Sequence, residues 1–176
     1  TGYEALLRWE HPIRGMIMPM DFIPIAEETG LIHEIGARAL NLACQEAATW
    51  GTDQVVSVNL SPVQFKSGNL LHVVTLALAD SGLPAHRLEL EITESVLLGN
   101  SEENVNTLRA LKELGASISL DDFGTGYSSL GYLKKAPFDK IKIDQSFVRG
   151  ATQEGSRNGA IIASITSLAH ALGMET

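Results

Sequence analysis

Hydrophobic and polar residues alternate in several short segments of the chain, and this alternation predicts β-strands. In residues 55–60, 87–93, 117–121 and 140–143 the apolar side chains occupy every second position. Successive side chains of a strand point to opposite faces, so each of these strands would have one apolar and one polar face. Residues 3–9 are predicted to form a further strand at the start of the chain.

Segments with helical spacing separate these strands. Their apolar residues recur three or four positions apart, which predicts helices over 21–29, 31–50, 69–81, 101–114 and 156–172. Asp21 is expected to cap the first helix, and Leu42 is expected on the buried face of the second. Residues 11–19 are predicted to be a loop because two prolines and a glycine interrupt them. A helical turn is expected near 128–134.

The alternation of strands and helices predicts βαβ units and a parallel sheet. A doubly wound sheet would need apolar residues on both faces of its strands. Here one face of each strand is apolar and the other is polar. A barrel with helices outside and a polar interior fits this pattern. A one-sided α/β layer with a solvated polar face is the alternative.

Composition and charge narrow the class of protein. The chain has 176 residues, of which 44% are hydrophobic and 6% aromatic, which suits one layered α/β domain. No apolar run reaches 18 residues, no signal segment opens the chain, and the single cysteine, Cys44, excludes a disulfide framework. We therefore expect a cytoplasmic protein or the cytosolic part of a membrane-anchored one. The net charge of −8 argues against a nucleic-acid duplex as partner.

Polar residues gather where the predicted strands end. Functional side chains of a barrel lie at the carboxyl ends of its strands. The candidates at these ends are Asn59, Glu91, Glu94, Asp121, Asp122, Lys142 and Asp144, with Glu4, Leu6 and Arg8 on the first strand. Carboxylate and amide oxygens without clustered cysteine or histidine favour Mg²⁺, Mn²⁺ or Ca²⁺ over structural zinc.

The convergence of several carboxylates predicts a metal-dependent reaction. Like charges in one cleft repel each other unless they are neutralised, and divalent cations would neutralise them. Two such ions are the usual clamp for phosphoester hydrolysis. An acidic site could hold a phosphodiester through these metals, with Arg8 and Lys142 assisting. The adjacent pair Asp121 and Asp122 precedes Gly124 and Gly126, which suits a metal site under a mobile loop.

Five motifs in order resemble those of the EAL domain family, the cyclic di-GMP phosphodiesterases. They are Glu4-Ala5-Leu6-Leu7-Arg8-Trp9, Asn59-Leu60-Ser61, Glu91-Ile92-Thr93-Glu94, Asp121-Asp122-Phe123-Gly124-Thr125-Gly126-Tyr127-Ser128-Ser129-Leu130 and Lys142-Ile143-Asp144. The resemblance implies a TIM-barrel-like (β/α)₈ fold with one strand antiparallel to the others. About five strands are present, so residues 1–176 are expected to be a single partial EAL domain that lacks the preceding strand and the last strands.

The resemblance also implies a two-metal site. Glu4, Asn59, Glu91 and Asp121 would bind one metal ion. Asp122 would bind the second, and Asp121 would bridge the two ions. The implied cofactor is Mg²⁺ or Mn²⁺, with Ca²⁺ as an inhibitor.

The remaining roles implied by the resemblance concern substrate, loop and partners. Lys142 would hold or polarise the attacking water, Arg8 would contact a phosphate of cyclic di-GMP, and Leu6 would lie near a base. Glu94 would hold the loop within 123–134, the region through which a homodimer is expected. An upstream sensor or diguanylate cyclase domain is a further expected partner.

Three functions remain open at this point. The first is hydrolysis of cyclic di-GMP to linear pGpG. The second is a receptor that binds cyclic di-GMP without cutting it, and the third is another metal-dependent barrel enzyme of the aldolase or enolase type. A later glutamate of the family would lie beyond Thr176, so these residues alone are expected to show little or no turnover.

Overall fold

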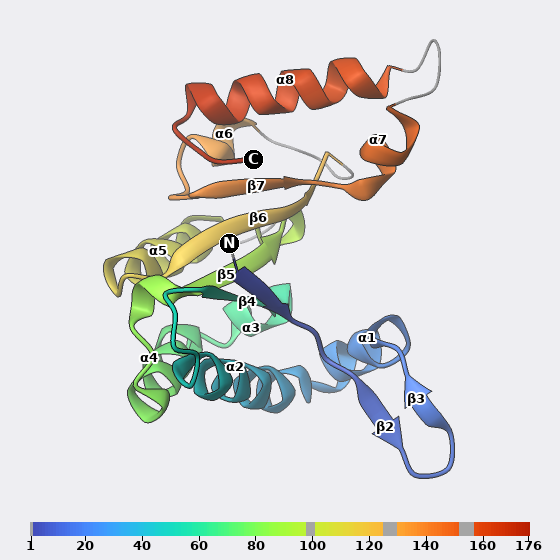
Figure 1. Cartoon of the computed structure of the whole chain (residues 1–176), viewed down its shortest axis with the longest axis vertical. Helices are drawn as coiled ribbons and strands as arrows, with labels where there is room; N and C mark the ends of the chain where they lie inside the picture. Colours follow the sequence, from blue (N-terminus) through green and yellow to red (C-terminus); the bar gives the residue numbers. More distant parts are fainter. Residues whose placement is uncertain (1, 98–100, 125–129, 152–156) are drawn as a thin grey trace.

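A five-stranded parallel sheet forms the centre of the structure. The computed structural model describes residues 2–97, 101–124, 130–151 and 157–176. The strands lie in the order β1-β4-β5-β6-β7, and all four pairings are parallel. Their bounds are Gly2–Ala5 for β1, Val55–Leu60 for β4, Leu88–Thr93 for β5, Ser117–Phe123 for β6 and Lys140–Ile143 for β7. The sheet curls, and helices cover its outer face (Figure 1).

The covering helices follow the strands in sequence. Helix α2 packs on β4, α5 packs on β6, α8 packs on β7, and α4 lies between α2 and α5. Their bounds are Ile32–Ala48 for α2, Leu70–Ser81 for α4, Ser101–Glu113 for α5 and Asn158–Ala171 for α8. The expected helical segments are therefore present, with ends displaced by a few residues. None of the helices in the described segments combines the length and apolar character needed to cross a bilayer.

Short elements link the strands to these helices. They are the β2–β3 hairpin (Trp9–His11 and Gly15–Ile17), α1 (Pro19–Thr29), α3 (Pro62–Lys66), α6 (Leu130–Leu133), α7 (Gln145–Gly150) and two 3₁₀ turns, Ala85–Arg87 and Glu94–Leu97. The hairpin projects away from the sheet, and α1 lies beside it (Figure 1). The predicted turn near 128–134 overlaps α6, but residues 125–129 lie outside the described segments.

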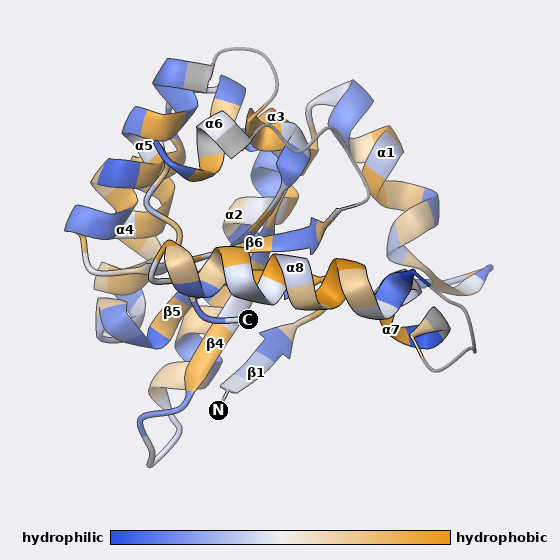
Figure 2. Cartoon of the chain, turned by 90° about the horizontal axis from the view of Figure 1, so that it is seen from above, coloured by the Kyte–Doolittle hydropathy of each residue, from blue (hydrophilic) through white to orange (hydrophobic). Residues whose placement is uncertain are grey.

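Apolar residues of the strands form the core beneath the helices. The fully buried side chains include Leu88, Leu90, Ile118, Leu120 and Ile141. Figure 2 shows the hydrophobic colour of β4 and β5 and the two-sided colouring of helices α4 and α5. The alternation seen in the sequence therefore places one face of every central strand against helices.

Part of the polar face of the sheet is buried as well. Glu89 is 6% exposed, Glu91 is 2% exposed and Ser119 is fully buried. These residues alternate with the core residues of β5 and β6, so they lie on the inner, concave side. A flat layer with a solvated polar face would leave them in water, so the barrel-like interpretation holds. The antiparallel strand expected from the resemblance is not among the described pairings of this sheet.

The first thirty residues differ most from the sequence-based prediction. The predicted strand 3–9 ends at Ala5, and most of the predicted loop 11–19 belongs to the β2–β3 hairpin, which begins at Trp9. Gly15 adopts a positive φ of 71°, and the His11 imidazole accepts hydrogen bonds from two backbone N–H groups of the turn. Gly15 and His11 thus stabilise a hairpin turn in a segment that the sequence predicted to be a loop.

Two details of the helix predictions are wrong. Asp21 does not cap α1, because Pro19 begins the helix after Met18 and leaves Asp21 inside the first turn. Leu42 is 46% exposed rather than buried. The buried face of α2 instead contains Leu40, Ala43, Cys44 and Ala47, whose mostly small side chains allow close packing on β4 and α4.

The Cys44 thiol is expected to be unreactive in the folded protein. Cys44 is completely buried, and burial raises the pKa of its thiol to about 11. A thiol reagent such as DTNB at pH 8 should therefore give no colour with native protein and one equivalent after denaturation in urea, since the thiolate is the reactive form. Rapid stoichiometric reaction without denaturant would contradict the packing of α2 described here.

Candidate functional site

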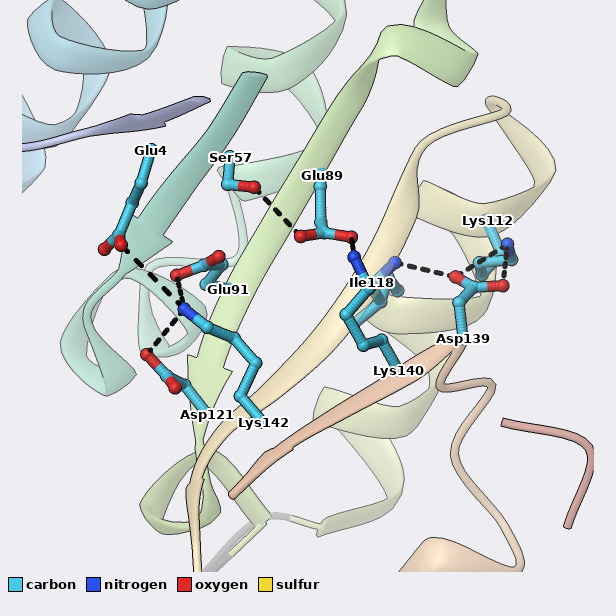
Figure 3. A network of polar contacts seen from close by, with 10 residues as sticks. All are labelled: Glu4, Ser57, Glu89, Glu91, Lys112, Ile118, Asp121, Asp139, Lys140 and Lys142. Atoms are coloured by element: carbon cyan, nitrogen blue, oxygen red, sulfur yellow. Dashed lines mark hydrogen bonds and ion pairs between the residues drawn. The ribbon is translucent and has the colours of Figure 1, made fainter. Parts of the chain in front are cut away.

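One cationic side chain lies at the centre of the polar face. The Lys142 Nζ atom lies 2.7 Å from Glu91 Oε2, 3.3 Å from Asp121 Oδ2 and 3.9 Å from Glu4 Oε2 (Figure 3). The lysine comes from β7, and its three partners come from β5, β6 and β1. We call Glu4, Asn59, Glu91, Asp121 and Lys142 the central cluster.

Strand β4 contributes Asn59 to this cluster. Its Nδ2 donates a hydrogen bond of 2.7 Å to Glu4 Oε1. The register places Asn59 opposite Glu91, and Asp121 lies opposite Thr93 at the end of β5. Each of the five strands thus supplies one polar side chain, because the strands are parallel and their carboxyl ends meet at one edge.

Burial and pairing act in opposite directions on the two closest partners. Burial raises the pKa of Glu91 above its ordinary value of 4.5, and Lys142 offsets part of this effect. Burial also tends to lower the pKa of Lys142, but the hydrogen bond and charge of Glu91, aided by Asp121 and Glu4, raise it above 10.5. In this arrangement Lys142 is an ammonium ion at neutral pH, and it donates hydrogen bonds to Glu91 and Asp121.

Asp122 lies at the edge of the central cluster, next to Asp121 and Asp144. Its backbone has a positive φ of 52°, and its N–H donates to Asp121 Oδ1 at 3.0 Å. This uncommon conformation lets two adjacent residues present their side chains at one strand end. Burial, followed by the charges of Asp121 and Asp144, raises the pKa of Asp122. Hydrogen bonds from the side chain and the backbone of Ser146 lower the pKa of Asp144.

Glu94 contacts the start of the glycine loop. Its Oε1 accepts a hydrogen bond of 2.7 Å from the Gly124 N–H, and its side chain is nearly buried in the 3₁₀ turn after β5. The predicted contact between Glu94 and this loop is therefore present at Gly124. Residues 125–129 lie outside the described segments, so the expected dimer contact through 123–134 stays a prediction.

Leu6 and Arg8 lie outside the central cluster, in the segment between β1 and β2. Leu6 is 56% exposed and lines a cavity of about 430 Å³ that Asn59 also borders. The Arg8 guanidinium is exposed and donates to the Leu7 carbonyl at 2.6 Å. Both side chains are exposed in the segment that follows β1.

Two polar contacts near the site were missed by the sequence-based prediction. Lys140 pairs with Glu89 on the inner face of the sheet, and the Ser61 hydroxyl donates to Glu27 Oε1 at 2.5 Å. Period two along β5 and β7 could have found the first contact, because Glu89 and Lys140 each precede a cluster residue by two positions. No sequence signal relates Glu27 on α1 to the end of β4.

The carboxylates of the central cluster contact the Lys142 ammonium rather than one another. Within the described segments, no three aspartate, glutamate, histidine or cysteine side chains stand together as a ready metal-binding group. The ammonium of Lys142 occupies the position between three carboxylates instead. The carboxylate oxygen atoms of the central cluster therefore surround a positive charge in this structure.

A comparison with protein families shows the family of this chain. The family model described as "EAL domain" matches residues 1–176. The chain belongs to the EAL domain family. The match includes all five strands and every residue of the central cluster.

Characterised relatives of this EAL domain are multidomain signalling proteins. The bifunctional diguanylate cyclase/cyclic di-GMP phosphodiesterase MucR of Pseudomonas aeruginosa is 42% identical over 178 residues, covering 99% of this chain and 26% of MucR. The oxygen sensor protein DosP of Escherichia coli is 39% identical over 177 residues, covering 98% of this chain and 22% of DosP. The chain thus spans about a quarter of the length of these relatives.

A solved EAL structure confirms the fold. The MucR phosphodiesterase in complex with c-di-GMP superimposes with a TM-score of 0.91 at 42% identity, covering 97% of this chain and 70% of the solved one. The EAL enzyme Bd1971, solved with cAMP and cyclic di-GMP, gives a TM-score of 0.91 at 32% identity and covers 98% of this chain. The predicted TIM-barrel-like EAL fold with five strands present is therefore confirmed.

Proposed function

We propose that this EAL domain catalyses metal-dependent hydrolysis of cyclic di-GMP to linear pGpG. The observation that carries the proposal is the cluster of one polar side chain from each of five strands, in which three carboxylates surround the Lys142 ammonium and Asn59 donates to Glu4. A family whose members act on cyclic di-GMP supports the choice of substrate. Oxygen donors without cysteine or histidine support metal-assisted phosphoester chemistry.

The donor set fits hard divalent cations such as Mg²⁺ or Mn²⁺. Glu4, Asn59, Glu91 and Asp121 would hold the first ion. Asp122 would hold the second, with Asp121 between the two. When bound, these ions would activate a water molecule and stabilise charge on the attacking and leaving oxygens. Ca²⁺ is expected to inhibit, because it demands more ligands in a looser geometry.

The side chains around the metals would position substrate and water. Lys142 would donate a hydrogen bond to the attacking water or to a phosphate oxygen, as its ammonium does to Glu91 in this structure. Arg8 would contact a phosphate through its guanidinium, which matches phosphate geometry. Leu6 would pack against a base at the cavity that it shares with Asn59.

The proposal is tested by incubating cyclic di-GMP with the longest form of the protein that carries these residues. Chromatography should show linear pGpG when Mg²⁺ or Mn²⁺ is present. Replacement of Mg²⁺ by Ca²⁺ should retain binding but stop product formation. Tight binding of cyclic di-GMP with no product under any of these ions would instead identify a receptor.

A further inference from the structure

A second ion pair lies directly beneath the central cluster. The Lys140 Nζ lies 2.5 Å from Glu89 Oε2, and the Ser57 hydroxyl donates to Glu89 Oε1 at 2.9 Å (Figure 3). Ser57 and Glu89 are both buried. All three residues precede members of the central cluster by two positions, so they form the next layer toward the amino ends of the strands. No role in the proposed reaction has been assigned to this lower pair.

The two layers repeat the same contact. Glu89 and Glu91 face inward from β5, and Lys140 and Lys142 face inward from β7, so each lysine must reach across the intervening strand β6. A cavity of about 530 Å³ is bordered by these four side chains together. Each lysine therefore has a second glutamate within the same cavity as a possible alternative partner.

Small residues on β6 leave room for Lys140 and Lys142 to reach over this strand to the glutamates of β5. The register places Ser119 opposite Glu91 on one side and opposite Lys140 on the other. Its hydroxyl is buried and has no hydrogen-bond partner among the described residues. Ser117, two positions earlier, lines the shared cavity. The serines leave space above β6, but they do not themselves fix which lysine meets which glutamate.

Charge pairing can determine which lysine contacts which glutamate. Glu89 and Glu91 are about 6.6 Å apart along one strand face, a distance that a flexible lysine side chain can cover. A buried carboxylate without a partner is strongly unfavourable. If Glu89 lacked Lys140, its charge would attract the Lys142 ammonium away from Glu91 and Asp121. With Lys140 in place, Glu89 is satisfied, and Lys142 stays in the central cluster.

We propose that Lys140 and Glu89 are positioning residues that confine Lys142 to the central cluster by pairing with each other. The expected effect on turnover rests on the proposed hydrolytic function. Its structural part, the location of the Lys142 ammonium, is independent of that function and is measured separately.

The first test is steady-state kinetics of Lys140→Met in the longest form of the protein that carries these residues. We expect kcat to fall by about 10- to 100-fold with KM nearly unchanged, because a group misplaced by about 1 Å can cost 100-fold in rate. The matched control is Lys112→Met, which breaks the ion pair between Lys112 and Asp139 (2.8 Å) away from the inner face. This control should lower the melting temperature but leave kcat at the wild-type value.

The second test is rescue by removal of the competing charge. In the double variant Glu89→Gln/Lys140→Met no unpaired carboxylate remains to attract Lys142, so kcat should return close to the wild-type value. A merely structural role predicts the opposite, since the double variant removes more polar contacts than the single one. A double variant no faster than Lys140→Met, or a single variant with wild-type kcat, would overturn the proposal.

A readout without substrate separates this proposal from the proposed function. Reductive methylation followed by mass spectrometry reports the reactivity of the Lys142 amine. The rate of Lys142 methylation should change several-fold in Lys140→Met and return to the wild-type rate in the double variant. An unchanged rate in all three proteins would overturn the positioning role even if cyclic di-GMP is hydrolysed. Changed rates in a protein without hydrolysis would support the positioning role and count against the proposed function.

Discussion

Replacement of Asp121 by asparagine is expected to reduce kcat for cyclic di-GMP hydrolysis by about 100- to 1000-fold, the range for loss of one preorganised electrostatic group. Asp121 is the residue proposed to bind both metal ions. Its Oδ2 faces Lys142 at 3.3 Å, and its Oδ1 accepts the Asp122 N–H at 3.0 Å. Asparagine preserves the shape but removes the charge, so the fold should persist while the affinity for both metals falls.

The control for this substitution is Asp53→Asn, the same chemical change on an exposed residue in the turn before β4. It should leave kcat, KM and the melting temperature unchanged. Kinetics with Mg²⁺ and circular dichroism of both variants make the comparison. An Asp121→Asn protein with wild-type kcat would contradict the role of the central cluster in catalysis.

The second large effect is expected for Glu94→Ala. Loss of this carboxylate leaves the Gly124 N–H without its acceptor and frees the chain directly after Asp122. Residues that orient metal ligands typically contribute 10- to 100-fold to metal affinity or activity. We expect a loss of about that size in kcat and in binding of the second Mn²⁺ ion, with a smaller change in affinity for cyclic di-GMP.

Isothermal titration with Mn²⁺ and with cyclic di-GMP separates these effects. Glu94→Gln should retain part of the activity because its amide oxygen can still accept from Gly124. Glu113→Ala, on the exposed end of α5, is the matched control and should behave as wild type. Equal losses of second-metal binding, turnover and substrate binding would mean that Glu94 does not act through the loop.

Strands β4 to β7 could be predicted from the sequence because each is short and has apolar residues at every second position. Strands β4 and β7 have the predicted bounds, and the buried carboxylates Glu89 and Glu91 follow from period two. The hairpin at Trp9–Ile17 could not be found, since its turn depends on side-chain contacts of His11 rather than on a hydropathy pattern. The phase of α2 was also hard to predict: Leu42 is exposed, and Ala43, Cys44 and Ala47 share the buried face with Leu40.

The candidate site was predictable in its membership but not in its contacts. Parallel strands bring their carboxyl ends to one edge, so Asn59, Glu91 and Asp121 had to be neighbours once the strands were placed. The sequence could not show that Lys142 lies between the carboxylates, because this depends on side-chain conformation across β6. It also could not show the positive φ of Asp122, which depends on the local backbone.

The most direct test of the account is the metal dependence of cyclic di-GMP cleavage. Protein freed of metal with EDTA is incubated with cyclic di-GMP before and after addition of Mg²⁺ or Mn²⁺, and the nucleotides are separated by chromatography. We expect unchanged cyclic di-GMP without metal and linear pGpG as the product once metal is restored. Cyclic di-GMP that stays intact with metal present, or pGpG that forms equally well in EDTA, would contradict it.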